Sequence, residues 1–284
     1  MIEGMVETEW RLIELSSGHP VKQTAVDEVI IEQVAAGKSP PTIRFWQVER
    51  PTISVGRNQS LEDDVYVRKA VDDGIEIVRR PSGGGSDYLS ADDICYSVII
   101  PANLLSKSAI NTTKNYLHVY KKIASALKSV GIETHFENPC NIMTGNRKIG
   151  NMAQFAPSGV VLVHGKIRYS LPLDRTLRHF VCKECKEAHS LLLHRKSFAE
   201  AMTCVADHKV PFRKLYSALK SALVEGLKYK SAEFISGEER KLLEDKEKFY
   251  DSDNWKKGAS IPHKVRYGFC DEHLNGVPII KLYK

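Results

Sequence analysis

The sequence predicts an α+β fold in which a mixed β-sheet core is flanked by helices. Segments with strand character alternate with segments of helical periodicity over the first part of the chain. No regular βαβ repeat links them, which argues against a doubly wound parallel sheet. The chain has 284 residues with 42% hydrophobic content, enough for one large core, and it contains no long polar low-complexity stretch.

The first hundred or so residues are expected to form strands around one long helix. Apolar residues at helical spacing predict a helix over Ala25–Ala36, which Gly37 and two prolines end. Thr42–Val48 and Thr52–Val55 have strand character, with a polar turn after the second. The other elements expected here are a short helix over Leu61–Asp73 and strands over Ile75–Val78 and Ile94–Ile100.

The rest of the chain is expected to continue with mixed elements and to become mostly helical after His179. An amphipathic helix over Asn115–Val130 ends at Gly131, and Thr144-Gly145-Asn146 predicts the turn of a hairpin over Ile142–Ala153. Further expected elements are a strand over Gly159–Val163, helices over Lys214–Tyr229 and Glu238–Phe249, a turn over Asp251–Ser260 and a strand over Val277–Tyr283. We expect a main domain over residues 1–235 and a short C-terminal extension over residues 236–284.

Composition narrows the class of protein. No apolar run approaches the roughly 18 residues that a membrane span needs, and the N-terminus lacks the pattern of a signal peptide. Six irregularly spaced cysteines are typical of thiols in a reducing compartment, so we expect a cytoplasmic protein. The net charge of +6 is scattered rather than gathered on one aromatic-rich face, which disfavours nucleic-acid binding.

The most informative segment is a glycine loop between two predicted strands, VRRPSGGGSDYL. Three consecutive glycines, Gly83–Gly85, allow the backbone to lie directly against a ligand, and Arg79 and Arg80 supply positive charge beside it. The segment matches neither a dinucleotide-binding fingerprint nor a P-loop. A flexible loop without function is the alternative, but strands tether this loop at both ends. We therefore expect it to bind an anion.

A second segment, PCNIMTGNRKIGNMAQ, places Lys148 just after a tight turn. A lysine that opens a strand there can hold its ammonium over a neighbouring loop. The alternative is that Arg147 and Lys148 merely alternate across an ordinary hairpin. The residues of this segment alone leave both interpretations open.

Together these two segments resemble the lipoate–protein ligases of the biotin/lipoate protein ligase superfamily, which also includes octanoyltransferases. The resemblance covers about residues 10 to 260, and its motifs occur in the family's order. The family loop, approximately R-R-x-[ST]-G-G-G-A-V-Y, is matched by Arg79, Arg80, Ser82, Gly83, Gly84, Gly85 and Tyr88. The family lysine motif, approximately D-I-x-x-G-x-K-K-I-x-G-x-A, is matched by Ile142, Gly145, Lys148, Ile149 and Ala153. Further matches are Asp27-Glu28, Pro51–Gln59, His164-Gly165 and, more loosely, Lys248, Phe249 and Trp255.

This resemblance implies a two-step reaction in which lipoate or octanoate and ATP form an acyl-adenylate. The acyl group then passes to a lysine of an acceptor lipoyl domain in a 2-oxoacid dehydrogenase or glycine-cleavage-type protein. In the implied site, Lys148 is catalytic and contacts the acyl carbonyl and the α-phosphate. The implied lipoate and acyl-AMP contacts are Arg79, Ser82, Gly83, Gly84, Gly85, Tyr88, Gln59, His164 and Gly165, with Val78, Tyr88 and Val163 expected to line an apolar slot.

Several positions depart from the family pattern. The acidic residue expected to hold Mg²⁺ before the isoleucine of the lysine motif is Asn141 here, and an amide oxygen is a weaker Mg²⁺ ligand than a carboxylate. Asp87 follows the glycines where the family has a small apolar residue, and it is the other candidate near a metal. Only about 50 residues follow position 235, fewer than a full accessory domain. An accessory function from a separate subunit would explain this.

Two alternative functions follow from these departures, and a third hypothesis concerns a separate cluster of cysteines and histidines. The first is an octanoyl or lipoyl transferase that works between carrier proteins without ATP, through a thioester on Cys182, whose pKa a neighbouring lysine would lower. The second is a non-catalytic lipoyl-binding relative. The third concerns a structural metal rather than the reaction: Cys182, Cys185, His189 and His194 have spacing close to a zinc knuckle, although residues on one helix face would show the same pattern.

Overall fold

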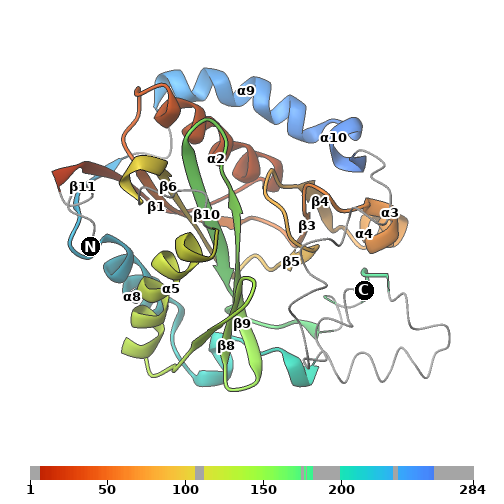
Figure 1. Ribbon diagram of the computed structural model, residues 1–284. Coiled ribbons are helices and arrows are strands. Elements are labelled where there is room, and N and C mark those ends of the chain that lie inside the picture. The colour runs from red at the N-terminus through yellow and green to blue at the C-terminus, as the bar shows by residue number, and fades with distance from the viewer. Residues whose placement is uncertain are drawn as a thin grey trace.

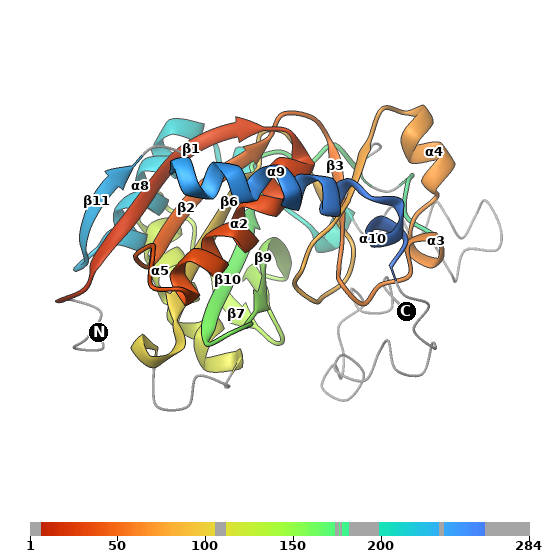
Figure 2. The same ribbon diagram turned by 90° about the horizontal axis from the view of Figure 1, so that it is seen from above.

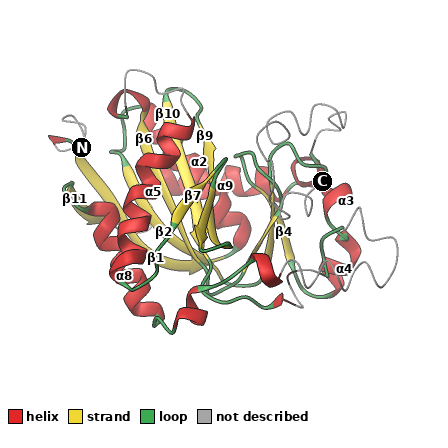
Figure 3. Ribbon diagram, turned by 60° about the horizontal axis from the view of Figure 1, so that its bottom comes forward, coloured by secondary structure: helices red, strands yellow, loops and turns green. Residues whose placement is uncertain are grey.

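The structure is a computed structural model that describes residues 7–105, 112–173, 176, 178–181, 199–232 and 236–258. Within these residues an eight-stranded mixed sheet carries helices on both faces, and a three-stranded sheet lies at its side (Figures 1 and 3). This arrangement confirms the predicted α+β class. None of the described helices is long and apolar enough to cross a membrane.

The large sheet has the strand order β11-β1-β2-β6-β10-β9-β8-β7. β1 pairs in parallel with both β2 and β11, and the other neighbours pair in antiparallel fashion. Its strands are β1 (Glu9–Gly18), β2 (Thr42–Val48), β6 (Ile94–Pro101), β7 (His135–Glu137), β8 (Asn141–Thr144), β9 (Arg147–Phe155), β10 (Val160–Ile167) and β11 (Lys228–Ala232). The small sheet has the order β4-β3-β5, with β3 (Thr52–Val55), β4 (Glu76–Arg79) and β5 (Asp87–Leu89).

Helices α2 (Pro20–Ala35) and α9 (Gly237–Asp251) lie side by side over one face of the large sheet (Figure 2). Helices α5 (Thr112–Ser129) and α8 (Phe212–Val224) pack together on the opposite face. The short helices α3 (Leu61–Asp64) and α4 (Val67–Asp72) flank the small sheet, and α10 (Asp253–Lys257) packs against β4. Two 3-10 turns, Ala102–Leu104 and Val205–His208, complete the described elements.

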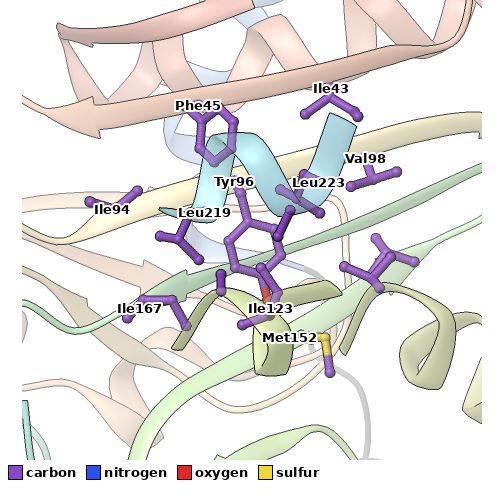
Figure 4. Close-up of a cluster of buried hydrophobic side chains, with 14 of the residues drawn as sticks. Ile43, Phe45, Ile94, Tyr96, Val98, Ile123, Met152, Ile167, Leu219 and Leu223 are labelled. Atoms are coloured by element: carbon purple, nitrogen blue, oxygen red, sulfur yellow. The ribbon is translucent and has the colours of Figure 1, made fainter. Parts of the chain in front are cut away.

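Alternation along the central strand β6 separates two hydrophobic cores. Ile94, Tyr96 and Val98 face the core beneath α5 and α8, and Figure 4 shows Tyr96 at the centre of that cluster. Ile99 instead joins the core under α2. On this second face Ser97 takes a position between apolar residues, so the α2 side of the sheet carries polar groups where the α5 side is apolar. The candidate site lies on this α2 side.

Most predicted elements are present with shifts at their ends, but the helix predicted over Leu61–Asp73 is wrong as a single element. It divides into α3 and α4 because Val65 bridges to Phe180 and the Tyr66 N–H donates to the His179 carbonyl. A long-range pairing therefore replaces the local helical hydrogen bonds at this point.

Two further predictions are wrong near the C-terminus. The helix predicted over Lys214–Tyr229 ends at Val224, because Gly226 adopts a left-handed conformation and Lys228 begins a strand that pairs with β1. The turn predicted over Asp251–Ser260 contains α10, whose N-cap Ser252 accepts a hydrogen bond from the Trp255 N–H. The strand predicted over Val277–Tyr283 lies outside the described residues, and no sequence pattern predicted β1.

A buried ion pair joins α9 to the large sheet. Arg11 on β1 donates two hydrogen bonds to Glu239, at 2.8 and 2.6 Å, and both side chains are buried. Glu239 also accepts a hydrogen bond from the Ser236 N–H in a capping box. Burial alone would raise the pKa of Glu239, but the hydrogen bonds from Arg11 and Ser236 outweigh it and the net shift is downward. The segment from 236 to 258 is therefore fixed to the sheet, and the domain boundary near residue 235 stays a prediction.

We expect Glu239→Gln to lower the free energy of unfolding by about 3 kcal/mol or more, because it leaves the Arg11 guanidinium buried without a counter-charge. The control is Glu238→Gln, whose carboxylate pairs with Lys38 at the exposed surface and should matter by about 1 kcal/mol at most. Urea unfolding measures both. Since the pKa of Glu239 is lowered in the folded state, the difference between parent and Glu239→Gln should shrink as the pH falls below about 4. Equal effects of the two substitutions would contradict this role of the pair.

Candidate active site

The glycine loop between β4 and β5 is shaped by the side chain of Arg80. Its Nη2 donates to the carbonyl oxygens of Gly83 and Gly85, each at 2.7 Å, and its Nη1 donates to the Ser54 carbonyl at 2.8 Å. Its Nε donates to Ser82 Oγ at 3.2 Å. Arg80 therefore holds the loop from inside, and the loop is ordered by specific hydrogen bonds.

Arg79 fixes the opposite side of the same region. Its guanidinium donates to the carbonyls of Gly56 at 2.7 Å and Gln59 at 2.8 Å, and to the carbonyls of Lys256 and Lys257 at the end of α10. The side chain is 1% exposed. The Arg79 guanidinium thus binds backbone carbonyl oxygens in this structure. Its contact with an anionic substrate stays a prediction, and these hydrogen bonds do not favour it.

The loop presents backbone N–H groups that have no partner among the described residues. The amides of Gly83, Gly84 and Gly85 donate no hydrogen bond there. Since the N–H and C=O of a trans peptide point in opposite directions, the Arg80 contact to Gly83 O directs the Gly84 N–H away from the guanidinium. A Cβ at Gly56 would lie 1.9 Å from the Gly84 carbonyl oxygen, so a glycine is required at that position. The result is a row of N–H donors of the kind that binds anions.

Beneath the loop lies a buried polar chain of three side chains from separate elements. Ser82 Oγ is 2.7 Å from His164 Nε2 on β10, and His164 Nδ1 is 3.4 Å from Asp27 Oδ2 on α2. Asp27 also accepts hydrogen bonds from Ser97 Oγ at 2.7 Å and Arg44 Nη1 at 2.6 Å. The structure therefore brings together Ser82 and His164, two predicted site residues, and adds Asp27 behind them.

Lys148 on β9 carries an ammonium with no hydrogen bond or ion pair to any described residue. Its backbone is fixed, because the Lys148 carbonyl accepts from the Thr203 N–H and from Arg168. Burial lowers the pKa of Lys148 below its usual value, and the Asp87 carboxylate opposes that shift. A partly buried amine without a partner is suited to act on a substrate.

Asp87 joins the glycine loop to the cations of β10. It forms an ion pair with Lys166 at 3.2 Å and accepts a hydrogen bond from Asn151 at 2.8 Å. Burial would raise the pKa of Asp87, but the charges of Lys166, Arg168 and Lys148 dominate and lower it. Lys166 also pairs with buried Asp93 at 3.2 Å. Asp87 is therefore a counter-ion of a basic cluster that includes Lys148.

These contacts do not fit a Mg²⁺ site at the two predicted positions. Asp87 is engaged by Lys166 and Asn151, and Asn141, which pairs with Asn151 across β8 and β9, donates its amide to Glu137 at 3.3 Å. A Mg²⁺ site usually rests on one or two carboxylates that are available to the ion. No group of three or more His, Cys, Asp or Glu side chains suited to a metal occurs within the part of the chain that the structure describes.

The other predicted contact residues take varied positions. Gly165 lies against β9, where a Cβ would be 2.1 Å from the Asn151 carbonyl oxygen. Gln59 contributes backbone groups to the turn that Arg79 holds. The expected apolar slot is not formed as predicted, because Val78, Tyr88 and Val163 belong to three different hydrophobic clusters on different sides of the strands.

The predicted nucleophile Cys182 and its neighbours Cys185, His189 and His194 lie outside the described residues. The residue before them is placed: the Val181 N–H donates to the Asp64 carbonyl at 2.9 Å, and Asp64 accepts a weak hydrogen bond from Ser86 of the glycine loop at 3.4 Å. Among the described cysteines, Cys95 is buried as expected and burial raises the pKa of its thiol. Cys140 is half-buried and packs against the α5 side of the sheet.

Sequence reasoning missed four charged or polar members of this region: Arg44, Ser97, Lys166 and Arg168. A signal for two of them exists, because His164 and Lys166 alternate with a period of two along β10 and Arg168 continues this period one residue beyond its end. No local pattern marks Arg44 and Ser97, which become site neighbours only when β2 and β6 pair beneath α2.

Comparison with known proteins shows the family of this chain. The family model of the lipoyl protein ligase A/B catalytic domain matches residues 19–224. Octanoyltransferase LipM of Staphylococcus aureus is 26% identical over 279 residues, covering 88% of this chain and 99% of the relative. Octanoyltransferase LipM of Moorella thermoacetica is 32% identical over 185 residues, covering 58% of this chain and 67% of the relative.

Solved structures show the same fold. A bipartite lipoate protein ligase of Thermoplasma acidophilum superposes with a TM-score of 0.78 at 22% identity, covering 89% of this chain and 97% of that one. Lipoate-protein ligase A bound with ATP gives a TM-score of 0.74 at 22% identity, covering 88% of this chain and 99% of that one. At this level of identity the likeness concerns the fold.

We expect Asp87→Asn to lower the pKa of Lys148 further, because it removes the carboxylate charge that opposes the effect of burial. Titration of the lysine ε-carbon by NMR, with the Lys148 signal assigned through Lys148→Arg, measures this shift. Asp92→Asn is the matched control, since Asp92 accepts a hydrogen bond from Ser170 and has no part in the basic cluster. An unchanged or higher Lys148 pKa in Asp87→Asn would contradict the electrostatic coupling.

Proposed function

We propose, on the premise that this chain belongs to the lipoyl protein ligase A/B catalytic domain family, that it transfers octanoyl or lipoyl groups from one carrier protein to another without ATP. Family membership makes the chain an enzyme that handles lipoate or octanoate. The choice of transfer over ATP-dependent ligation is the proposal. The observation that carries it concerns the two positions predicted to lie near Mg²⁺. Asp87 is engaged by Lys166 and Asn151, and the other position is the amide Asn141, so neither predicted position offers a free carboxylate.

The relatives support this choice. The matched proteins of S. aureus and M. thermoacetica are octanoyltransferases, and the first aligns over 88% of this chain. The ligases found among solved structures are similar in fold at about a fifth identity. We infer from the transferase relatives that the donor is an acyl thioester on a carrier protein. We infer from the family that the acceptor is the lysine of a lipoyl domain.

The described residues include donors that could stabilise the transition state of such a transfer. In acyl transfer, negative charge develops on the carbonyl oxygen in the transition state, and preorganised N–H donors stabilise it. The free amides of Gly83–Gly85 and the Lys148 ammonium are donors of this kind, close to the same basic cluster. In the first step an enzyme cysteine thiolate attacks the donor carbonyl, the donor C–S bond breaks, and the carrier thiolate leaves as the enzyme thioester forms. In the second step the acceptor lysine amine attacks this thioester, an amide forms, and the amine proton passes to the released cysteine thiolate.

We propose Cys182 as that cysteine. The Val181 N–H donates to the Asp64 carbonyl, and the Asp64 carboxylate accepts from Ser86 of the glycine loop, so residue 181, which precedes Cys182 in the sequence, lies near the loop. A cation lowers the pKa of a nearby thiol, and the Lys148 ammonium, which has no hydrogen bond or ion pair within the described residues, suits that role. Cys140 is the half-buried cysteine among the described residues and serves as the comparison.

ATP-dependent ligation is the second candidate function. One observation favours it: a row of free N–H donors together with an unpaired lysine would also stabilise the negative charge of an α-phosphate. A ligase would release pyrophosphate when lipoate and ATP are both present. A transferase would modify the acceptor domain without free lipoate and without ATP. Measuring acceptor modification with and without ATP therefore separates the two functions.

We expect the protein to transfer octanoate from octanoyl carrier protein to an apo lipoyl domain in ATP-free buffer, detected as a mass increase of the acceptor. Cys182→Ser should reduce this transfer by a factor of at least about 10³, because it removes the nucleophile. Lys148→Ala should reduce it as well, and Cys140→Ser should retain it. Activity in Cys182→Ser together with loss in Cys140→Ser would assign the nucleophile to Cys140. Acceptor modification that requires free octanoate and ATP would replace the transferase by the ligase.

A further inference from the structure

The buried chain Ser82, His164 and Asp27 has the order and spacing of a hydroxyl nucleophile, a base and an orienting carboxylate. The three side chains come from the glycine loop, β10 and α2, so no local structure forces them together. We propose that Ser82 is a second acyl-accepting nucleophile, and that this site also hydrolyses medium-chain acyl thioesters to the free acid through an acyl-serine ester. The choice of an acyl thioester as the substrate rests on the proposed function; the role of Ser82 rests on the geometry of the three side chains.

The Ser82 hydroxyl lies within hydrogen-bond distance of the imidazole. Arg80 Nε donates to Ser82 Oγ at 3.2 Å, and Ser82 Oγ is 2.7 Å from His164 Nε2, a contact in which either atom can donate. We assign the imidazole proton to Nδ1, which faces Asp27 at 3.4 Å. In that tautomer His164 Nε2 accepts the Ser82 proton as a general base.

Asp27 is held ready to stabilise the imidazolium that forms. Ser97 and Arg44 both donate to its carboxylate, at 2.7 and 2.6 Å. Burial alone would raise the pKa of Asp27, but Arg44 and His164 outweigh it, so the carboxylate stays ionised. The negative charge behind His164 favours transfer of the Ser82 proton to the ring.

Backbone donors lie directly beside the hydroxyl. Gly83 follows Ser82 in the chain, and the N–H groups of Gly83 and Gly84 donate to no described residue. In acyl transfer by serine enzymes, the N–H of the residue after the nucleophile is a usual donor to the tetrahedral oxyanion. Ser82 itself is buried, but a Cβ at Gly83 would meet no atom within 4 Å, and Gly84 is exposed. Open space therefore adjoins Gly83, the residue that follows Ser82.

The proposed reaction balances with water as the other reactant. Ser82 Oγ bonds to the acyl carbonyl carbon, its proton moves to His164 Nε2, and the C–S bond breaks as His164 returns that proton to the leaving thiolate. Water then attacks the serine ester and gives one proton to His164, which passes it to Ser82 Oγ as the acid leaves. The sum is acyl thioester and water giving carboxylic acid and thiol.

The test uses the Cys182→Ser variant, so that an acyl-cysteine at that position cannot contribute. We expect incubation with the octanoyl thioester of N-acetylcysteamine, without acceptor protein, to release octanoate and to leave an octanoyl adduct. Peptide mass mapping should place the adduct on Ser82. Neutral hydroxylamine should leave it in place, because it cleaves thioesters much faster than oxygen esters. An adduct on another residue, or none during measurable hydrolysis, would overturn the proposal.

Three substitutions in this background separate chemistry from folding. Ser82→Ala should abolish the adduct, and His164→Asn should slow hydrolysis by about 10²–10⁴-fold, the usual contribution of a general base. Ser90→Ala, in the turn after β5, is the matched control and should hydrolyse like the parent. If Ser82→Ala hydrolyses the thioester at the parent rate and melts at the parent temperature, Ser82 is not the nucleophile.

A measurement on the unsubstituted protein avoids any dependence on variants that fail to fold. A fluorophosphonate probe reacts with activated serines, so we expect it to label Ser82; labelling elsewhere alone, or none, contradicts the proposal. Transfer to the lipoyl domain is measured in parallel. Transfer without Ser82 acylation defeats this inference alone, and Ser82 acylation without transfer defeats the proposed function alone.

Discussion

A half-buried guanidinium that donates to three backbone carbonyls and to Ser82 Oγ determines the form of this site. Arg80 lies inside the glycine loop and donates to Gly83, Gly85 and Ser54, and removing its charge from water lowers its pKa. The loop supplies acceptors for Arg80 by turning the Gly83 and Gly85 carbonyls inward. The N–H groups of these two peptides, which belong to Gly84 and Ser86, point in the opposite direction. Arg80 thus sets the shape of the loop and directs the Gly84 N–H outward.

Arg79 extends this constraint across the molecule. It ties the turn before α3 to the end of α10, while the Trp255 indole N–H donates to the Arg79 carbonyl at 2.8 Å. Trp255 packs against Phe249 and Tyr250 of α9, which in turn is fixed to β1 through Glu239 and Arg11. The segment from 236 to 258 therefore supports the glycine loop from behind. Movement of this segment would displace the residues that support the loop.

The two sheets meet at the candidate site, and each supplies different chemistry. The small sheet provides the loop with its N–H donors and Ser82, and the large sheet provides His164, Lys166 and Lys148 on its α2 side. The opposite face of the same strands is filled by an apolar core around Tyr96. The alternation of β10 allows one strand to serve both purposes, because its even-numbered positions are polar from 164 to 168 while odd-numbered ones are apolar up to Ile167.

Local patterns predict β4, the hairpin of β8 and β9 and the two central motifs, because a glycine run, a tight turn and period-two alternation act over a few residues. They do not predict β5, a strand of three residues that forms after the loop by pairing with β3. They did not reveal what Arg79 and Arg80 bind. Arg79 donates hydrogen bonds to carbonyls that lie 176 to 178 residues later in the sequence, and no local pattern predicts such contacts. For the same reason Lys228 was assigned to a helix although it pairs with β1. Asp27 was found only as part of a family match, and its contact with His164 follows from the packing of α2 on the sheet.

We expect the N–H groups of the glycine loop to bind an anion. The most direct test is to titrate the protein with octanoate and to follow the amide proton chemical shifts of Gly83 and Gly84 by NMR. Hydrogen bonding to a carboxylate moves an amide proton downfield, so both glycine signals should shift downfield and saturate together with binding. Other exposed glycines, such as Gly37 and Gly74, should not move. Saturable octanoate binding that leaves Gly83 and Gly84 unshifted would contradict an anion-binding role for the loop.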